Sequence, residues 1–131
     1  MSTLNVGTIK SISSAAPVFQ NTSGTEKGQL CKVWVSFNGT GTVAIRDSFN
    51  VSSITDNGNS GAYTINFSNA MANANYCAMI SAGNHAVNSR GSWNAIYDDT
   101  TTVAGSCRVA LYGNSGGFED NEQVFFAAFG D

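Results

Sequence analysis

Residues 33–68 read VWVSFNGTGTVAIRDSFNVSSITDNGNSGAYTINFS. Apolar and small polar residues alternate along much of this stretch. Such alternation is typical of strands with one buried face, because successive side chains of a strand point to opposite sides of the sheet. Val33, Val35 and Phe37 fall on one face at its start, and Trp34 falls on the other. The stretch therefore predicts antiparallel strands that cover a core.

Tight-turn signals interrupt the alternation at two places, Asn38-Gly39 and residues 56–61. Asn and Gly adopt the positive φ angles that hairpin turns require, at little steric cost. After the second place, Tyr63 and Ile65 resume the inward face. We therefore expect two hairpins, each joining neighbouring antiparallel strands.

Strand-like runs continue to the end of the chain. They are residues 76–82, 92–99, 107–113 and 122–130. With the first stretch they make about eight short strands, and no segment has the period of a helix longer than a turn or two. We expect an all-β protein, folded as an antiparallel, jelly-roll-like β-sandwich.

Charge is scarce in this chain. Charged residues make up 11% of its 131 residues, against roughly 25% in ordinary soluble domains. The formal net charge is −3, and the basic residues are scattered as Lys10, Lys27, Lys32, Arg46, Arg90 and Arg108. No basic stripe exists to neutralise phosphates, so we expect no nucleic-acid partner. No apolar run reaches the ~20 residues of a membrane helix, so we expect no membrane insertion.

The first 28 residues differ from the rest. They are small and polar, with isolated apolar residues, and residues 23–28 have the composition of a linker. Too few apolar groups are present to form a core there. We expect an extended attachment segment at residues 1–28, ordered only against the body or a neighbouring subunit, and a β-sandwich domain at residues 29–131.

The last strand is apolar on both faces. Val124 and Phe126 lie on one side of it, and Phe125 and Phe129 on the other. A sandwich strand has one inner face, so the second face needs its own cover. A like subunit is the simplest cover, because homomeric interfaces are more apolar than ordinary surface. The alternative is a strand buried from both sides near a sheet crossing. We assign these four residues to a subunit interface.

Three cysteines, Cys31, Cys77 and Cys107, form an odd set without C-x-x-C spacing. This disfavours a disulfide framework and a zinc site. We expect each to act as a small apolar filler within a strand, with Cys77 facing a core. The start of the chain lacks a secretory signal pattern, and synthesis in a reducing cytoplasm is expected.

No catalytic constellation stands out. His85 is the only histidine, and no G-x-S-x-G nucleophile motif accompanies it. The loop acids are Asp98, Asp99, Glu119, Asp120 and Glu122. They are interpreted either as the paired carboxylates of a glycoside hydrolase or, more simply, as solvated turn residues. We predict no enzyme, no catalytic residue, no metal and no cofactor.

Aromatic rings interleaved with Asn, Ser and Gly form the remaining signal. They are Trp34, Trp93, Tyr97, Tyr112 and Phe118. Rings that stack and amides that hydrogen-bond make up sugar-binding and antibody-like surfaces, although strand-rich cores and interfaces contain them too. The residues expected to contact a receptor or ligand are His85, Asn88, Arg90, Trp93 and Phe118.

Residues 32–76 resemble a recurrent module of bacteriophage virion proteins, especially of marine and cyanobacterial phages. The resemblance lies in the order and spacing of WVSFNGTGTVAIR, SFNVSSITDNG and YTINFSNAMANANY. The opening STLNVGTIKS is similar to the short threaded start of fibre proteins of this kind. Such modules form the C-terminal part of tail fibres and related surface proteins.

The resemblance implies a homotrimeric structural protein of the virion, assembled in the host cytoplasm. It implies a tail fibre or receptor-binding element whose later loops contact a host surface glycan or protein. Residues 1–28 would attach it to other virion proteins. A capsid or tail decoration protein is the second interpretation, since the chain shows no fibre shaft. A fibre enzyme that degrades polysaccharide is the third.

Overall fold

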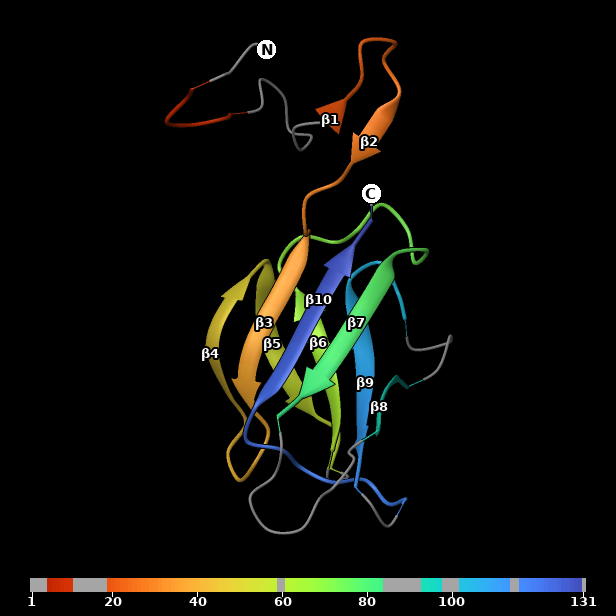
Figure 1. The fold of residues 1–131 in the computed structure, drawn as a ribbon. Helices are drawn as coiled ribbons and strands as arrows, with labels where there is room; N and C mark the ends of the chain where they lie inside the picture. The colour runs from red at the N-terminus through yellow and green to blue at the C-terminus, as the bar shows by residue number, and fades with distance from the viewer. Residues whose placement is uncertain are drawn as a thin grey trace. The chain divides into compact units, whose positions relative to one another are not determined.

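The structure is a computed structural model that describes residues 5–10, 19–58, 61–83, 93–97, 102–113 and 116–130, with only the backbone at Lys27 and Trp93. The chain divides into two compact units, Met1–Leu30 and Cys31–Asp131. Ten strands and no helix occur in the described ranges (Figure 1). Accordingly, that part of the chain holds no helix that is long and apolar enough to span a membrane.

The N-terminal unit contains a small hairpin, which the sequence pattern did not predict. Strands β1 (Phe19–Gln20) and β2 (Glu26–Gly28) pair in an antiparallel ladder. Asn21 organises the turn between them, because its side-chain oxygen accepts hydrogen bonds from the backbone N–H groups of Ser23 (3.1 Å) and Thr25 (2.8 Å). Such local side-chain bonds favour a turn over an extended chain.

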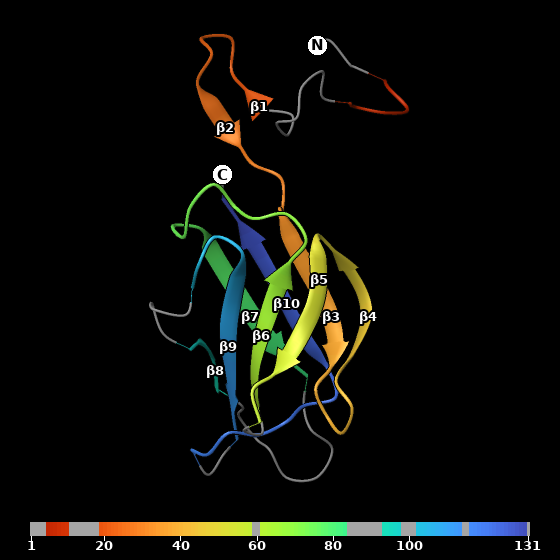
Figure 2. The same cartoon turned by 180° about the vertical axis from the view of Figure 1, so that it is seen from behind.

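The larger unit is a sandwich of two antiparallel four-stranded sheets, as predicted (Figures 1 and 2). The front sheet, nearest the viewer in Figure 1, has the order β4 (Ala44–Phe49), β3 (Val33–Asn38), β10 (Val124–Phe129), β7 (Cys77–Ala82). The back sheet has the order β5 (Val51–Asp56), β6 (Ala62–Phe67), β9 (Ser106–Tyr112), β8 (Trp93–Ile96).

The winding of the chain differs from a jelly roll. The consecutive pairs β3–β4, β5–β6 and β8–β9 each stay within one sheet. In a jelly roll nearly every successive strand changes sheet. The sandwich is therefore confirmed, whereas the jelly-roll-like connectivity expected from the strand spacing is not what the chain adopts. Strand spacing alone carries no information on which sheet a strand joins.

A single residue, Asn50, turns the chain from the front sheet into the back sheet. It lies between β4 and β5 with a φ of 59°, a left-handed conformation that Asn tolerates better than most residues. Its amide donates to the carbonyl groups of Lys32 (3.1 Å) and Asn69 (3.0 Å), and its oxygen accepts from the Asn69 N–H (2.8 Å). These bonds fix the corner.

The core lies between the sheets and follows the predicted alternation. Most of its buried members come from β3, β6, β9 and β10, and they include Val33, Val35, Phe37, Tyr63, Ile65, Cys107, Val109, Leu111, Val124 and Phe126. Phe37 and Tyr63 meet edge to face across the sandwich, with ring centroids 5.2 Å apart. Each fully buried large apolar side chain contributes about 1.5–3 kcal/mol, so these strands hold the two sheets together.

Strand β7 is an edge strand with one covered face, which corrects the placement of Cys77. Ile80 packs against the core, whereas Cys77 and Met79 are exposed. The register pairs Cys77 with Phe129 of β10 on the outer side of the front sheet. Cys77 therefore does not face a core; Cys107 does, and Cys31 is half-buried just before β3.

Candidate functional site

An aromatic ladder lies on the outer face of the back sheet. It consists of Tyr97, Phe118 and Tyr112, with Arg108 at one end. Tyr112 and Arg108 belong to β9, and Tyr97 follows β8, where its N–H donates to the Arg108 carbonyl (2.9 Å). Phe118 lies beyond β9 and forms an isolated antiparallel bridge with Tyr112.

The ladder is a continuous stack. The Arg108 guanidinium carbon lies 3.9 Å from the centre of the Tyr97 ring. The centres of Tyr97 and Phe118 are 6.0 Å apart, with an interplanar angle of 16°. Those of Phe118 and Tyr112 are 4.9 Å apart, at 25°. Phe118 is thus held between two tyrosines, and the stack ends in a cation above an aromatic face, a favourable arrangement.

Small side chains make room for Phe118. Alternation along β9 points Arg108, Ala110 and Tyr112 outward, because Val109 and Leu111 between them are in the core. Ala110 pairs with Ala95 of β8 and is fully buried although it points outward. We attribute this burial to the ring of Phe118, which stacks on the tyrosines of the rows on either side.

Hydroxyl and amide groups border the ladder. Thr64 of β6 pairs with Arg108 and with Thr55 of β5. Asn66 donates from its amide to the hydroxyl oxygens of Ser53 (3.1 Å) and Thr55 (2.9 Å). The Nε atom of Arg108 is buried without a hydrogen-bond partner, and no carboxylate in the described ranges pairs with its guanidinium. The site therefore combines stacked rings, polar side chains and the positive charge of Arg108.

The loop that carries Phe118 is anchored to the core through Asp120. Its Oδ1 accepts hydrogen bonds from the Tyr63 hydroxyl (2.5 Å) and from the Gly61 N–H (2.6 Å). The Tyr63 hydroxyl also lies 2.9 Å from the Gly39 carbonyl oxygen. Burial, reinforced by the bond to Asp120, raises the pKa of Tyr63 above its usual value of 10.0. The hydroxyl thus keeps its proton, and with it the anchor, at neutral pH.

Of the five residues predicted to contact a ligand, Phe118 belongs to this site, and three are outside the described residues. Phe118 is the middle ring of the ladder. The backbone of Trp93 lies opposite Tyr112 at the start of β8. His85, Asn88 and Arg90 are outside the described residues, as are Asp98 and Asp99. Of the acids considered for hydrolysis, Asp120 is engaged in the anchor.

The expected contact residues did not include Tyr97, Tyr112 or Arg108, although the two tyrosines were among the rings named as typical of a sugar-binding surface. A usable signal was present. In residues 107–112 the outward positions read Arg, Ala, Tyr, which is a cation and a ring separated by a small residue. Stacking across such a gap needs a third ring from elsewhere, and only the fold supplies it.

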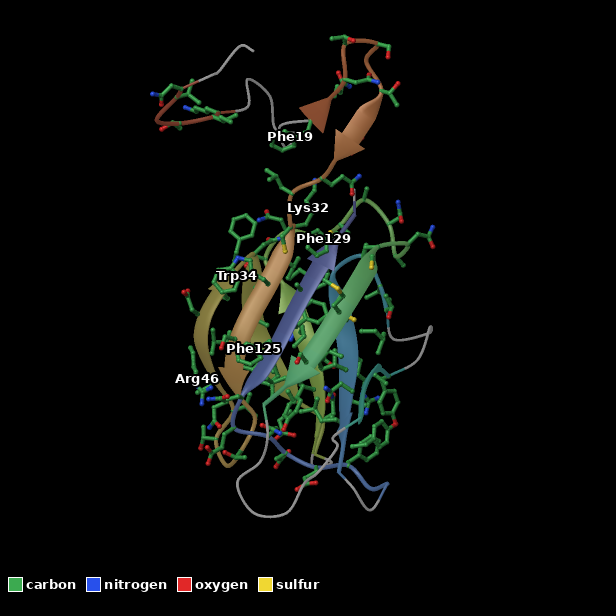
Figure 3. All side chains as sticks on the ribbon, viewed as in Figure 1. Phe19, Lys32, Trp34, Arg46, Phe125 and Phe129 are labelled. Atoms are coloured by element: carbon green, nitrogen blue, oxygen red, sulfur yellow. The ribbon has the colours of Figure 1, made fainter. Side chains whose placement is uncertain are left out.

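The structure corrects two of the four residues assigned to a subunit interface. Val124 and Phe126 are 0% and 2% exposed and belong to the core of their own chain. Phe125 and Phe129 lie on the outer side of the front sheet (Figure 3). Only these last two remain available to a neighbour.

The outer side of the front sheet carries an apolar face, which we define by its six members Trp34, Phe49, Met79, Phe125, Ala127 and Phe129. Four of them are well exposed, Trp34 at 37%, Phe49 at 54%, Met79 at 53% and Phe125 at 44%. These exposed fractions are large for apolar side chains, whose contact with water is unfavourable.

Beside the start of β7 the surface is hollowed. A hollow of about 500 Å³ opens beside the start of β7, with a lining that is mostly apolar and includes Tyr76, Cys77 and Ile96. The Tyr76 hydroxyl there donates to the Ser106 carbonyl (2.9 Å). Within the described residues, no group of His, Cys, Asp and Glu side chains is placed to hold a metal ion.

Comparison of the chain with protein-family models, with curated proteins and with solved structures finds no match. The likeness to phage virion modules therefore depends on the residues quoted for it alone.

Proposed function

We propose that the chain is a non-enzymatic structural protein of a phage virion, a tail fibre or receptor-binding element whose back sheet contacts a saccharide of the host surface. The observation that carries this proposal is the aromatic ladder, which ends in Arg108 beside a row of hydroxyl and amide groups. The likeness of residues 32–76 to phage modules supports the virion part.

The ladder has the groups that recognise sugars. Aromatic rings pack against the C–H surfaces of sugar rings, and amides and hydroxyls hydrogen-bond to sugar hydroxyl groups. Phe118 is stacked on both sides, so its role is to position Tyr97 and Tyr112. Tyr97 and Tyr112 carry the hydroxyl groups through which these rings would hydrogen-bond to a sugar. The guanidinium of Arg108 favours anionic saccharides, because it binds carboxylate and phosphate groups strongly.

The assembly proposed with this function is a homotrimer on the virion surface. Residues 1–28 reach neighbouring subunits or other virion proteins, and the sandwich is displayed outward. The Met1–Leu30 unit is compact by itself, which is compatible with an attachment element joined to a separate display domain.

The test is binding of the full chain to an array of immobilised bacterial surface polysaccharides and lipopolysaccharide cores. We expect binding to at least one anionic glycan, reduced at least tenfold by Arg108→Met, which keeps an unbranched apolar stem and removes the charge. The matched control is Arg46→Met on the exposed edge strand β4 of the opposite sheet, which should bind normally. No binding by the unaltered chain, or equal loss in both variants, overturns the proposal.

A decoration protein of the capsid or tail is the second candidate, and the apolar face is the observation that favours it. A decoration protein binds virion proteins instead of glycans. It predicts hundreds of copies in each virion and no adsorption to cells. Counting the copies in imaged particles, together with the array result, separates the two.

A further inference from the structure

We propose that the apolar face of the front sheet is the surface on which copies of this chain associate. All four strands contribute to it: Phe49 from β4, Trp34 from β3, Phe125, Ala127 and Phe129 from β10, and Met79 from β7. In β5 and β6 of the back sheet the outward positions are instead Ser53, Thr55, Thr64 and Asn66, and the outward rings described on that sheet belong to the ladder at its β8–β9 edge.

The strand register brings the members of this face into line. Trp34 pairs with Phe49 on one side and with Ala127 on the other, and Ala127 pairs with Met79. These four residues form one row across the whole sheet. Phe125 and Phe129 lie two residues to either side of Ala127 on β10, so they flank the row. The apolar side chains are therefore contiguous, as an interface core requires.

The size of the face indicates what covers it. Four strands about 4.8 Å apart, each about six residues of 3.4 Å, give a footprint of roughly 400 Å². The footprint also includes the outward polar residues Ser36, Asp47 and Ser81. It falls within the range of the largest apolar patches on monomers and is about half of the ~800 Å² that each partner buries in a standard interface. Further copies of the chain carry the same apolar face, so association between copies covers the face of each one.

The charges around the face also favour a second copy. Asp47 pairs with Ser36 on the outer side near one end of β3, and Lys32 precedes β3 at the other end. One charge of each sign at opposite ends gives neither a strongly acidic nor a strongly basic macromolecule an advantage. With a formal net charge of −3 on 131 residues, copies of the chain repel one another only weakly.

This inference rests on the assembly half of the proposed function and is independent of saccharide binding. The test is the mass of the full-length chain in solution at about 1–100 μM, measured by sedimentation or light scattering. We expect an oligomer, a multiple of the 13.7 kDa chain. Placing a charge in the face should raise the dissociation constant at least 100-fold, both in Phe125→Lys on β10 and in Met79→Lys on the neighbouring edge strand β7.

The matched control is Thr55→Lys, an exposed position on the outer side of the back sheet, which should leave the oligomer intact. Circular dichroism with thermal melting shows whether each variant keeps its β structure, and two separate positions guard against one that fails to fold. A monomer at 100 μM, or an oligomer that persists in both folded face variants, overturns the inference. Glycan binding that is lost only in Arg108→Met would still stand in either case.

Discussion

The two outer faces of the sandwich are built by the same rule and have opposite chemistry. On both sheets every second residue points away from a shared core. On the front sheet these residues are Trp34, Phe49, Met79 and Phe125; on the back sheet they are hydroxyl and amide residues with the ladder at one edge. Alternation decides which residues face outward, and only their chemical type decides what each face can do.

The faces also differ in how they are made. The front face consists entirely of strand residues, so it forms as soon as the sheet forms. The ladder needs Phe118, which arrives on a loop held by Asp120, Gly61 and Tyr63. The back face should therefore be the more sensitive of the two to changes at this anchor, and the front face the more sensitive to changes within strands.

The largest expected effect is a difference in stability between alanine variants of two adjacent phenylalanines on β10. Phe126→Ala empties a core position and should lower the free energy of unfolding by about 3–5 kcal/mol. Phe125→Ala, one residue away on the apolar face, should cost under about 1 kcal/mol in the monomer. Urea denaturation at a concentration low enough to prevent association measures both. Similar losses for the two would mean that the faces are not distinct.

The anchor of the ladder is tested by two glycines with positive φ. Gly58→Ala should cost about 1–2 kcal/mol for its backbone conformation alone, since nothing lies within 4 Å of its added Cβ. Gly61→Ala should cost at least 1 kcal/mol more, because its Cβ would lie 2.5 Å from the Leu111 carbonyl oxygen and 2.6 Å from that of Glu119.

Near-ultraviolet circular dichroism gives the second readout for these glycine variants. Stacked tyrosines contribute to that signal, so it should change in Gly61→Ala and remain in Gly58→Ala. Equal stabilities and unchanged spectra for both would remove Gly61 from the anchor.

Alkaline unfolding tests the Tyr63 bond directly. Burial, then the hydrogen bond to Asp120, raises the pKa of Tyr63 above 10.0 in the folded chain, and burial does the same for Tyr76. The unfolded chain therefore releases these protons first. The free energy of unfolding should be independent of these groups below about pH 10 and fall above it by about 1.4 kcal/mol per pH unit for each tyrosine.

The matched variant for the alkaline test is Tyr63→Phe, which should be less stable at pH 8 because Asp120 loses a donor. Above about pH 10 its free energy of unfolding should also fall less steeply with pH, because one titrating proton fewer distinguishes the folded from the unfolded chain. Urea titrations between pH 8 and pH 11 measure both quantities. An unchanged slope would show that Tyr63 titrates alike in the folded and unfolded chain.

The inner faces could be predicted from sequence because alternation and turn chemistry are local. Val33, Val35 and Phe37 are in the core as expected, and the Asn38-Gly39 turn joins β3 to β4. The two sides of β10 could not be told apart, because both Phe125 and Phe126 fit a buried position in a period-2 pattern. The pairing of β10 with β3 decides which side is buried, because Phe126 aligns with the core residue Val35. These two residues are far apart in the sequence, so no local pattern reveals the pairing.

The ladder was harder to predict from the sequence than the core. It joins residues from three separate segments, Tyr97 after β8, Arg108 and Tyr112 in β9, and Phe118 in a loop. No local pattern encodes a stack that closes only after two strands pair and a loop folds back. The N-terminal hairpin was missed for a different reason. Its turn depends on hydrogen bonds from the backbone N–H groups of Ser23 and Thr25 to the Asn21 side chain, and such bonds leave no apolar pattern in the sequence.

The smallest effect concerns the cation at the end of the ladder. Arg108→Lys keeps the charge but loses the planar group that lies over Tyr97. It should therefore cost about 0.5–1 kcal/mol, whereas Arg46→Lys on the exposed edge of the front sheet should cost nothing measurable. A double-mutant cycle with Tyr97→Leu isolates the contact, because a stacked pair gives a coupling energy and two independent residues give none. Zero coupling would show that the guanidinium gains nothing from the Tyr97 ring, and the stack would then consist of the three rings alone.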